Sequence, residues 1–391
     1  MHLSAVLLYA KFSPFHLARL EASGSVAIEN GNTLHGIEIA GFESDYGWQF
    51  NLPVGKCFVH HTLFPEADFH KITYRELRSS LWQCLDRINP DVIVLPGWTS
   101  PGRAGLAWAL ARGIPRILMT DSQKKDKRQT VVRTLIKRIL AHRFQAGFAA
   151  GAPHVRWLGE LGLPLAKCRT GCDVVDNSYF RIAADRRRST PAKANDAPVL
   201  LSCLRLVPRK NVIGILECLA SPSVRWHWRI AGDGPERAAI QQRVDELGLT
   251  NRVELVGRVQ YGDLPALYES GDVYLQPSIT EQWGLAVNEA MASSLPVLVS
   301  NRCGCHEDLV WEGINGFTFD PLDRGSVGTA LERMWEKRDR WNEMGVASQS
   351  IIADWGLGRF ASGFWEACRL AAADGETLHS NIADCLVRIC L

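Results

Sequence analysis

Short apolar runs alternate with amphipathic segments along both halves of the sequence. In the second half, the runs read as buried strands are APVLLSCL, WHWRIAG, NRVELVG, DVYLQPS and LPVLVSN, and the helical patterns between them are NVIGILECLA, PERAAIQQRVDELGL, DLPALYES and GLAVNEAMAS. The first half alternates likewise, with strands predicted at AVLLYA, DVIVLPG, PRILMTDS and QAGFAAG. Strands separated by crossover helices form parallel sheets, so this alternation predicts an α/β protein.

The length of 391 residues is too great for one ordinary core and predicts two domains. The polar, aperiodic segment at 186–198 reads as a linker between them. We predict two Rossmann-like, doubly wound domains, at 1–185 and 199–360, that face each other across a cleft. Residues 361–391 are predicted to form a C-terminal helical tail that can pack back on the first domain. Ligands are expected at the carboxyl ends of the strands.

Positive charge is concentrated in one segment. The whole chain has 44 Lys and Arg against 42 Asp and Glu, a net charge of +2, but residues 124–143 hold eight bases and one acid, giving +7. A helix through this segment is amphipathic, with basic residues off its apolar face. The apolar face consists of Val132, Leu135, Ile136, Ile139 and Leu140. Two interpretations remain open: docking on an anionic membrane surface, or a core-packing helix with a solvated basic back.

Several features concern the compartment. No run of about 18 apolar residues occurs, so no membrane span is predicted. The start MHLSAVLLYAK lacks a basic region before its apolar part and reads as a strand rather than a signal peptide. Eleven cysteines without a CxxC pair favour reduced thiols in a cytoplasmic protein, with a Cys303–Cys305 disulfide as the alternative. The docking interpretation would make the protein peripheral on the inner face of the membrane.

Several common motifs are absent. No G-x-G-x-x-G follows a strand, and the P-loop spacing from Gly97 to Gly102 continues with Arg103 and Ala104 in place of Lys and Ser or Thr. No His, Cys and Asp residues show metal-ligand spacing, so no metal site is expected. The basic stretches match no nucleic-acid module.

Two carboxylates lie eight residues apart in ITEQWGLAVNEAMAS. Glu281 falls in the loop after the strand DVYLQPS, Gly284 permits a close backbone approach, and a helix is expected from about Leu285 to Ser293. The free N–H groups at the start of that helix form an anion site. Glu289, one turn inside, can accept hydrogen bonds from two adjacent hydroxyls. A sugar linked through a diphosphate to a ribose has this polarity.

Two cations, Arg205 and Lys210, follow the first strand of the second domain in LRLVPRKN. A diphosphate leaving group gains negative charge as its bond to the sugar breaks, and fixed cations stabilise that charge. A glycosidase acid pair would instead need its carboxyl groups roughly 5–9.5 Å apart. Eight residues of helix rise about 12 Å, which disfavours this alternative.

The chain resembles the family-4 retaining glycosyltransferases of the GT-B fold. The resemblance covers about residues 199–335 and rests on LRLVPRKN, IAGDGPER, VELVGRV, the Glu281–Glu289 stretch and EGINGFTFDP. It implies a retaining, hexosyltransferase-type enzyme that moves a sugar from a nucleotide-diphospho-sugar to a glycan or lipid-linked acceptor without a bound metal. The second domain would bind the donor and the first domain the acceptor.

The resemblance also implies individual roles on the donor side. Arg205 and Lys210 correspond to the pair on the diphosphate. Glu281 corresponds to the acid that holds the donor sugar, with the amides of Gly284 and Leu285 beside it.

At the nucleoside end, Glu289 is similar to the ribose ligand, and the backbone at Arg258 and Val259 is similar to the turn that contacts the base. The chain departs from the family at Leu204, where the family has Gly before its first cleft Arg. On the acceptor side Asp121 takes the place of a family histidine, and a helix cap is its alternative role.

The loop YAKFSPFHLARL departs from the family's Gly-rich first loop. Ser13 and Pro14 are expected to be a helix N-cap and its first residue. His16 is either an acceptor-side residue or an ordinary surface histidine. Two functional alternatives to the transferase remain: a catalytically silent GT-B-like binding or scaffold protein, and a nucleotide-sugar epimerase.

Overall fold

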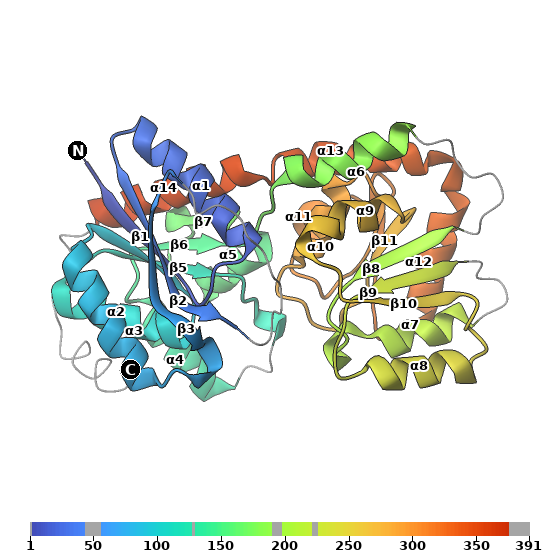
Figure 1. Ribbon diagram of the computed structural model, residues 1–391, viewed down its shortest axis with the longest axis horizontal. Helices are drawn as coiled ribbons and strands as arrows, with labels where there is room; N and C mark the ends of the chain where they lie inside the picture. Colours follow the sequence, from blue (N-terminus) through green and yellow to red (C-terminus); the bar gives the residue numbers. More distant parts are fainter. Residues whose placement is uncertain (1, 44–55, 127–129, 190–197, 221–225, 375–391) are drawn as a thin grey trace. The chain divides into compact units, whose positions relative to one another are not determined.

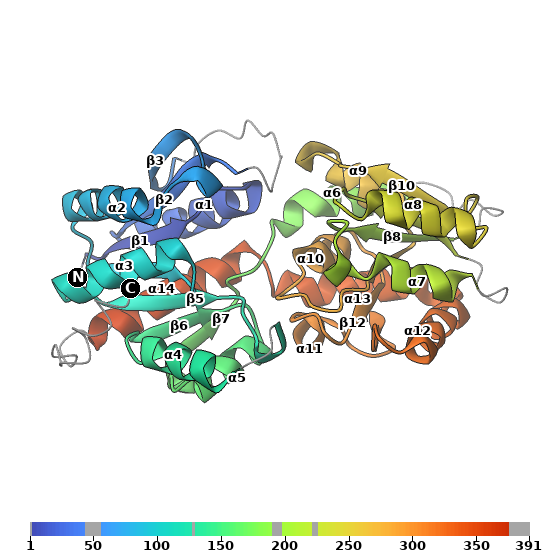
Figure 2. The same ribbon diagram turned by 90° about the horizontal axis from the view of Figure 1, so that it is seen from below.

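The computed structural model describes residues 2–43, 56–126, 130–189, 198–220 and 226–374. The chain forms two units, one made of residues up to Val174 together with the chain from Leu357 onward, and one made of Val175–Gly356. Each unit contains one sheet (Figures 1 and 2). Within the described ranges, no helix combines the length and the apolar character needed to cross a membrane.

The first unit is built on a seven-stranded sheet in the order β3-β2-β1-β4-β5-β6-β7, with parallel pairing throughout. The strands are β1 (Ser4–Tyr9), β2 (Thr33–Phe42), β3 (Val59–Asp68), β4 (Val92–Pro96), β5 (Arg116–Thr120), β6 (Ala146–Ala149) and β7 (Cys168–Thr170). The α-helices are α1 (Pro14–Glu29), α2 (Tyr74–Ile88), α3 (Ser100–Arg112), α4 (Val131–Ala141), α5 (Ala152–Glu160) and α14 (Leu357–Ala373).

Helix α14 completes the first unit although it lies at the far end of the sequence. It runs beside α1 in Figure 1, and the indole N–H of Trp365 donates to the backbone oxygen of Ser23 at 2.9 Å. Phe360 stacks edge-on against Phe148 of β6, with ring centroids 5.1 Å apart. Phe364 is fully buried. The first unit is therefore assembled from two separated stretches of chain.

The second unit holds a six-stranded parallel sheet in the order β10-β9-β8-β11-β12-β13. The strands are β8 (Val199–Cys203), β9 (His227–Ala231), β10 (Val253–Gly257), β11 (Val273–Gln276), β12 (Val297–Ser300) and β13 (Gly316–Phe319). The α-helices are α6 (Asn177–Ser189), α7 (Val212–Leu219), α8 (Arg237–Glu246), α9 (Leu264–Glu269), α10 (Leu285–Ala292), α11 (His306–Leu309), α12 (Arg324–Glu336) and α13 (Trp341–Ala353).

The division between the units differs from the predicted domain boundary at residue 185. Helix α6 belongs to the second unit because it packs on α9 and α10, where Phe180 is fully buried. The predicted linker at 186–198 overlaps the end of α6, and its residues 190–197 lie outside the described ones. The predicted tail at 361–391 begins inside α14, and its residues 375–391 also lie outside the described part of the chain.

The packing of α14 generates a stability prediction. Phe364→Ala should lower the free energy of unfolding by about 3–5 kcal/mol, because it removes a fully buried ring and leaves a cavity. Urea unfolding followed by circular dichroism measures the change. Arg369→Ala, at an exposed position of the same helix, is the control and should stay within about 0.5 kcal/mol of the wild type. Equal effects of the two substitutions would show that α14 does not stabilise the first unit.

Candidate active site in the second unit

The strand order of the second sheet defines a place for a ligand. The chain adds β9 and β10 on one side of β8 and then adds β11, β12 and β13 on the other side. The strand order therefore reverses between β8 and β11, and the loops that leave these two strands lie at the carboxyl edge of the sheet. In open α/β sheets, ligands bind at such a switch point, and Figure 2 shows β8 near the middle of the second unit.

Lys210 and Glu281 meet at this switch point. The ammonium group of Lys210, from the loop after β8, contacts the carboxylate of Glu281, from the loop after β11. Only 11% and 12% of their side chains are exposed. The same carboxylate oxygen lies 3.2 Å from the amide nitrogen of Gln276 and 3.1 Å from the hydroxyl of Ser278. Three donors thus fix the orientation of Glu281.

The loop that carries Lys210 is fixed by its backbone. Pro208–Lys210 forms a 3-10 turn, and Asn211 follows in the left-handed conformation with φ 57°. The side-chain amide of Asn211 donates to the backbone oxygen of Pro321 at 2.9 Å. The N–H of Ile279 donates to the backbone oxygen of Arg209 at 2.8 Å, which joins the loops after β8 and β11 directly.

Arg205 lies in a loop that packs backbone to backbone against the GDG turn after β9. A Cβ on Gly232, whose φ is +139°, would lie 1.7 Å from the backbone oxygen of Leu204, and a Cβ on Gly234 would lie 2.3 Å from that of Leu206. Only glycine permits this approach. Leu204 itself is buried and belongs to the core of the unit, while Arg205 between the two leucines is exposed.

The departure from the family's glycine at Leu204 is thus accommodated by packing. Leu204 is not among the described residues with a positive φ, so its position does not require glycine. The side chain turns into the core instead.

Glu289 lies on α10 in a buried environment. Its side chain accepts a hydrogen bond from the hydroxyl of Tyr268 on α9, and only 4% of the residue is exposed. Burial raises the pKa of Glu289 to about 8, an effect that the hydrogen bond from Tyr268 opposes. The ligand-free protein therefore holds a carboxyl group that is largely protonated at neutral pH.

The N-terminus of α10 carries no side-chain cap. Gly284 is the N-cap residue, with φ 108° and ψ 61°, so Leu285 is the first residue of the helix, as the sequence predicts. The loop that precedes α10 is bonded to the segment after β12, because the N–H of Gly304 donates to the backbone oxygen of Glu281 at 3.0 Å. Cys303 and Cys305 in that segment are both free thiols, so the disulfide alternative is wrong.

Arg258 and Val259 follow β10 at the same edge of the sheet. The N–H of Gly232 donates to the backbone oxygen of Gly257 at 2.7 Å, which places this turn beside the GDG turn. Arg258 is exposed and Val259 is half-buried. The loops after four neighbouring strands, β10, β9, β8 and β11, thus converge. The loops after β8, β10 and β11, together with α10, carry the predicted donor-side residues, which are Arg205, Lys210, Arg258, Val259, Glu281, Gly284, Leu285 and Glu289.

Sequence reasoning missed the residues that hold the two glutamates. Gln276 and Ser278 fix Glu281, and Tyr268 fixes Glu289. Gln276 is 1% exposed at the end of an otherwise apolar strand. A buried amide in such a strand needs hydrogen-bond partners, so the glutamine in DVYLQPS was a usable signal.

The two predicted acceptor-side residues lie in the first unit. His16 is not an ordinary surface histidine: its ring stacks on Tyr9 with centroids 4.0 Å apart, and its Nδ1 accepts from the N–H of Ser13 at 3.1 Å. Burial, with the nearby charge of Arg19, lowers the pKa of His16 to about 3 and keeps it neutral. Ser13 caps α1, as predicted. Asp121 directly follows β5 and does not cap α4, whose N-cap is Thr130.

Glu38, which sequence reasoning missed, holds the loop between β1 and α1 in place. The buried carboxylate of Glu38 accepts hydrogen bonds from the N–H of Phe12 at 2.9 Å and from the hydroxyl of Thr62 at 2.8 Å, and it pairs with His60 at 2.9 Å. Burial alone would raise the pKa of Glu38, but these hydrogen bonds outweigh it and the pKa is lowered.

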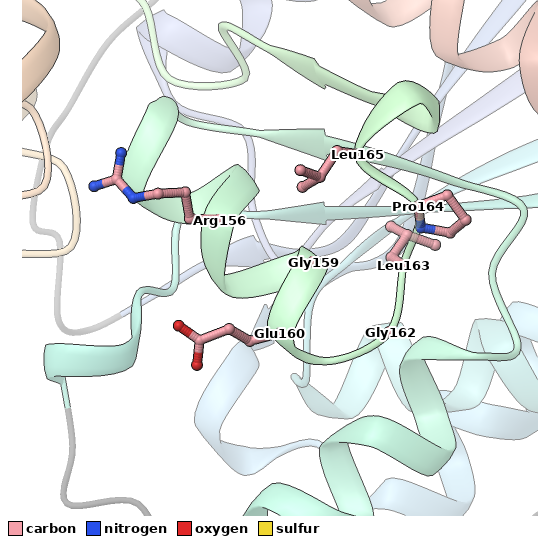
Figure 3. A pocket seen from close by; sticks show the side chains of 7 residues that line it. All are labelled: Arg156, Gly159, Glu160, Gly162, Leu163, Pro164 and Leu165. Atoms are coloured by element: carbon pink, nitrogen blue, oxygen red, sulfur yellow. The ribbon is translucent and has the colours of Figure 1, made fainter.

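A shallow pocket of about 480 Å³ lies elsewhere in the first unit (Figure 3). Apolar side chains of the loop after α5 line one side, and the charged side chains of Arg156 and Glu160 lie on the other. None of the predicted site residues lines it. Its lining residues are Arg156, Gly159, Glu160, Gly162, Leu163, Pro164 and Leu165. Among the residues that the structure describes, no group of three His, Cys, Asp or Glu side chains is placed to hold a metal ion.

The pKa of Glu289 generates a prediction about stability and pH. Its pKa in the folded protein, about 8, is above the ordinary 4.5, so the protonated form stabilises the fold below pH 4.5. This contribution is lost as the pH rises to about 8. Glu289→Gln cannot ionise and should exceed the wild type by on the order of 3 kcal/mol in unfolding free energy at pH 9, with a far smaller difference at pH 5.

Urea unfolding of the ligand-free protein across this pH range measures the effect. Glu332→Gln, at an exposed position of α12, is the control. If Glu289→Gln and the wild type kept a constant difference from pH 5 to pH 9, the buried carboxyl group would not be protonated in the folded state.

Part of the sequence is similar to known proteins. Residues 184–350 match the family described as glycosyl transferases group 1. An alpha-D-kanosaminyltransferase of Streptomyces kanamyceticus is 27% identical over 155 residues, which are 38% of this chain and 40% of that protein. The chain spans 38% to 43% of the length of the first three curated relatives it matches.

Solved structures match almost the whole chain. Sucrose-phosphate synthase from Thermosynechococcus elongatus superposes with a TM-score of 0.71 at 17% identity, over 94% of this chain and 98% of that one. Anabaena HepE in complex with UDP-glucose gives 0.69 at 17% identity, over 94% and 100%. At this identity the likeness establishes the fold. The chain thus has the GT-B fold, and its residues 184–350 are similar to the glycosyl transferases group 1 family.

Proposed function

We propose that the protein is a retaining glycosyltransferase of the family-4 type, of hexosyltransferase character, that moves a sugar from a nucleotide-diphospho-sugar to a glycan or lipid-linked acceptor. The observation that carries this proposal is the contact between Lys210 and Glu281 at the switch point of the second sheet. It joins a cation and a carboxylate from two loops at the place where this type of sheet binds ligands.

Lys210 supplies the charge that the departing diphosphate needs. As the bond between the sugar and the diphosphate breaks, negative charge gathers on the leaving oxygen, and a preorganised cation stabilises it most where water is excluded. Lys210 is 9% exposed, so its charge is shielded from bulk water. Arg205, exposed in the same loop system, is the second cation of the proposed pair.

Glu281 is the proposed ligand of the donor sugar. Gln276 and Ser278 would keep its carboxylate in place when Lys210 engages a diphosphate, because both donate to it independently of Lys210. The uncapped N-terminus of α10 offers the N–H groups of Gly284 and Leu285 to an anion nearby.

Glu289 is the proposed ribose ligand. It follows Glu281 on the same segment, and its carboxyl group is held by Tyr268 inside the unit. The backbone at Arg258 and Val259, beside the GDG turn, is the proposed contact to the base. The structure of HepE in complex with UDP-glucose supports a nucleotide sugar as the ligand of this fold.

Charge stabilisation by Lys210 and Arg205 is proposed to proceed without a resident metal ion. His16 and Asp121 are the proposed acceptor-side residues of the first unit, where each lies near the carboxyl end of a strand, β1 and β5 respectively.

The role of Lys210 can be tested by turnover. Lys210→Ala should lower turnover by on the order of 10²-fold or more, the effect of removing a preorganised charge stabiliser. The neighbouring Arg209→Ala, at an exposed position of the same turn, is the matched control and should keep near-normal turnover. The assay is transfer or hydrolysis of a radiolabelled nucleotide sugar, with thermal melting to verify folding. A folded Lys210→Ala protein with wild-type turnover would remove the diphosphate role.

The proposed independence of metal has its own test. Activity should be largely unchanged after treatment with EDTA, because Lys210 and Arg205 already supply positive charge to the leaving group. The same labelled-sugar assay is run before and after chelation, with added Mg²⁺ or Mn²⁺ as the control. Complete loss with EDTA, restored by either ion, would mean that a metal carries the leaving group.

A further inference from the structure

Helix α4 turns its apolar side chains outward. Of its described residues only Ala141 is buried, although the helix is strongly amphipathic in sequence. The usual surface helix of a globular protein buries its apolar stripe against the core. Here five large apolar side chains, named the outer face, are exposed. They are Val131 (86%), Val132 (67%), Leu135 (55%), Ile136 (52%) and Ile139 (42%).

The contacts of α4 with the rest of the unit explain this orientation. The ammonium group of Lys137 lies over the ring of Trp157, 5.5 Å from its centroid, and 5.9 Å from that of Trp98. Ala141 packs in a small cluster with Trp157 and Leu161. Helix α4 thus contacts the rest of the first unit through Lys137 and Ala141. The core-packing interpretation of the sequence is therefore wrong for four residues of the predicted face, Val132, Leu135, Ile136 and Ile139. The fifth, Leu140, is half-buried against the core.

Arginines flank the outer face. At 100° per residue, Arg133 and Arg138 project on opposite sides of the arc that holds the five apolar side chains. Both arginines are exposed, and the Nε–H of Arg138 donates to the backbone oxygen of Glu160 at 3.2 Å. Lys124 and Lys125 precede the helix and are also exposed. An apolar strip with a basic rim is the pattern of helices that lie in a lipid interface.

We propose that the outer face inserts into the interfacial layer of an anionic lipid bilayer, with Arg133 and Arg138 on the headgroups. The occupant follows from charge complementarity, since residues 124–143 carry eight bases and one acid, a net +7. The proposed function enters this inference at one point only: membrane docking would bring the enzyme to a lipid-linked acceptor. The docking itself stands on the geometry of α4.

A second copy of the chain fits this surface less well. An 11-residue helix is about 16 Å long and about 10 Å wide, so its footprint is far below the roughly 800 Å² that each partner buries in a standard interface. The basic rims of two copies would also repel each other. An anionic bilayer can bury the outer face in its interfacial layer and pair its headgroups with Arg133 and Arg138.

The test uses the full-length protein and sedimentation with vesicles. Phosphatidylcholine vesicles containing phosphatidylserine should bind the protein, and pure phosphatidylcholine vesicles should bind it at least tenfold more weakly. Leu135→Gln/Ile136→Gln should reduce binding to the anionic vesicles at least tenfold. The matched control is Ile314→Gln/Leu322→Gln, which alters residues with 52% and 58% exposure in the second unit and should bind as the wild type does.

The two arginines beside the outer face, Arg133 and Arg138, are tested separately. Arg133→Ser/Arg138→Ser should weaken binding to anionic vesicles by about fivefold per arginine at low salt, and added salt should narrow the difference from the wild type. All altered residues are exposed, so circular dichroism and thermal melting should match the wild type.

Three outcomes would overturn the proposal: no binding to anionic vesicles, equal binding to neutral vesicles, or equal binding of the Leu135→Gln/Ile136→Gln protein and its control. Analytical ultracentrifugation adds a fourth: a wild-type dimer that this variant converts to a monomer would make the occupant a second copy. Transfer of a labelled sugar to a soluble acceptor is measured in parallel. Lost vesicle binding with intact transfer separates this inference from the proposed function.

Discussion

The close approach of backbone between the loops after β8 and β9 determines the geometry of the candidate site. Gly232 and Gly234 let these loops touch without side chains between them, and a Cβ at either position would overlap a backbone oxygen. This contact fixes the loop that starts at Leu204 and leads to Lys210. A bond from Ile279 to Arg209 then ties the loop after β11 to the same frame. Backbone contacts therefore position the two loops that carry Lys210 and Glu281.

Beneath the charged pair lies a chain of buried hydrogen bonds. The hydroxyl of Tyr274 donates to the side-chain oxygen of Gln276 at 2.7 Å, and the amide of Gln276 donates in turn to Ser278 and Glu281. Ser278 is fully buried. Buried polar groups of this kind stabilise one arrangement only when each finds a partner. The orientation of Glu281 is thus transmitted from the interior of the sheet.

Hydrophobic patterns in the sequence predicted most helices and strands of the second unit, but not the side-chain hydrogen bonds of the site. The strands from β8 to β12 and the helices α7 to α10 follow from apolar runs and helical periodicity, and Gly284 and Leu285 begin α10 as expected. The three-residue β7 was too short to recognise. The partners Tyr268 and Gln276 were missed because a tyrosine or glutamine shows its hydrogen bonds only in three dimensions. The direction of α4 was also unpredictable, since periodicity defines a face but not which way it points.

The separation of α14 from the rest of the first unit has a consequence for biosynthesis. The stretch up to Val174 leaves the ribosome without the helix that covers Phe148, and Trp365 meets Ser23 only after the whole second unit has been made. At typical rates of synthesis this delay is roughly 10–40 s. The contiguous second unit can complete its fold first. Until α14 is made, the nascent first unit exposes the apolar surface that this helix covers, and exposed apolar surface of this kind favours aggregation.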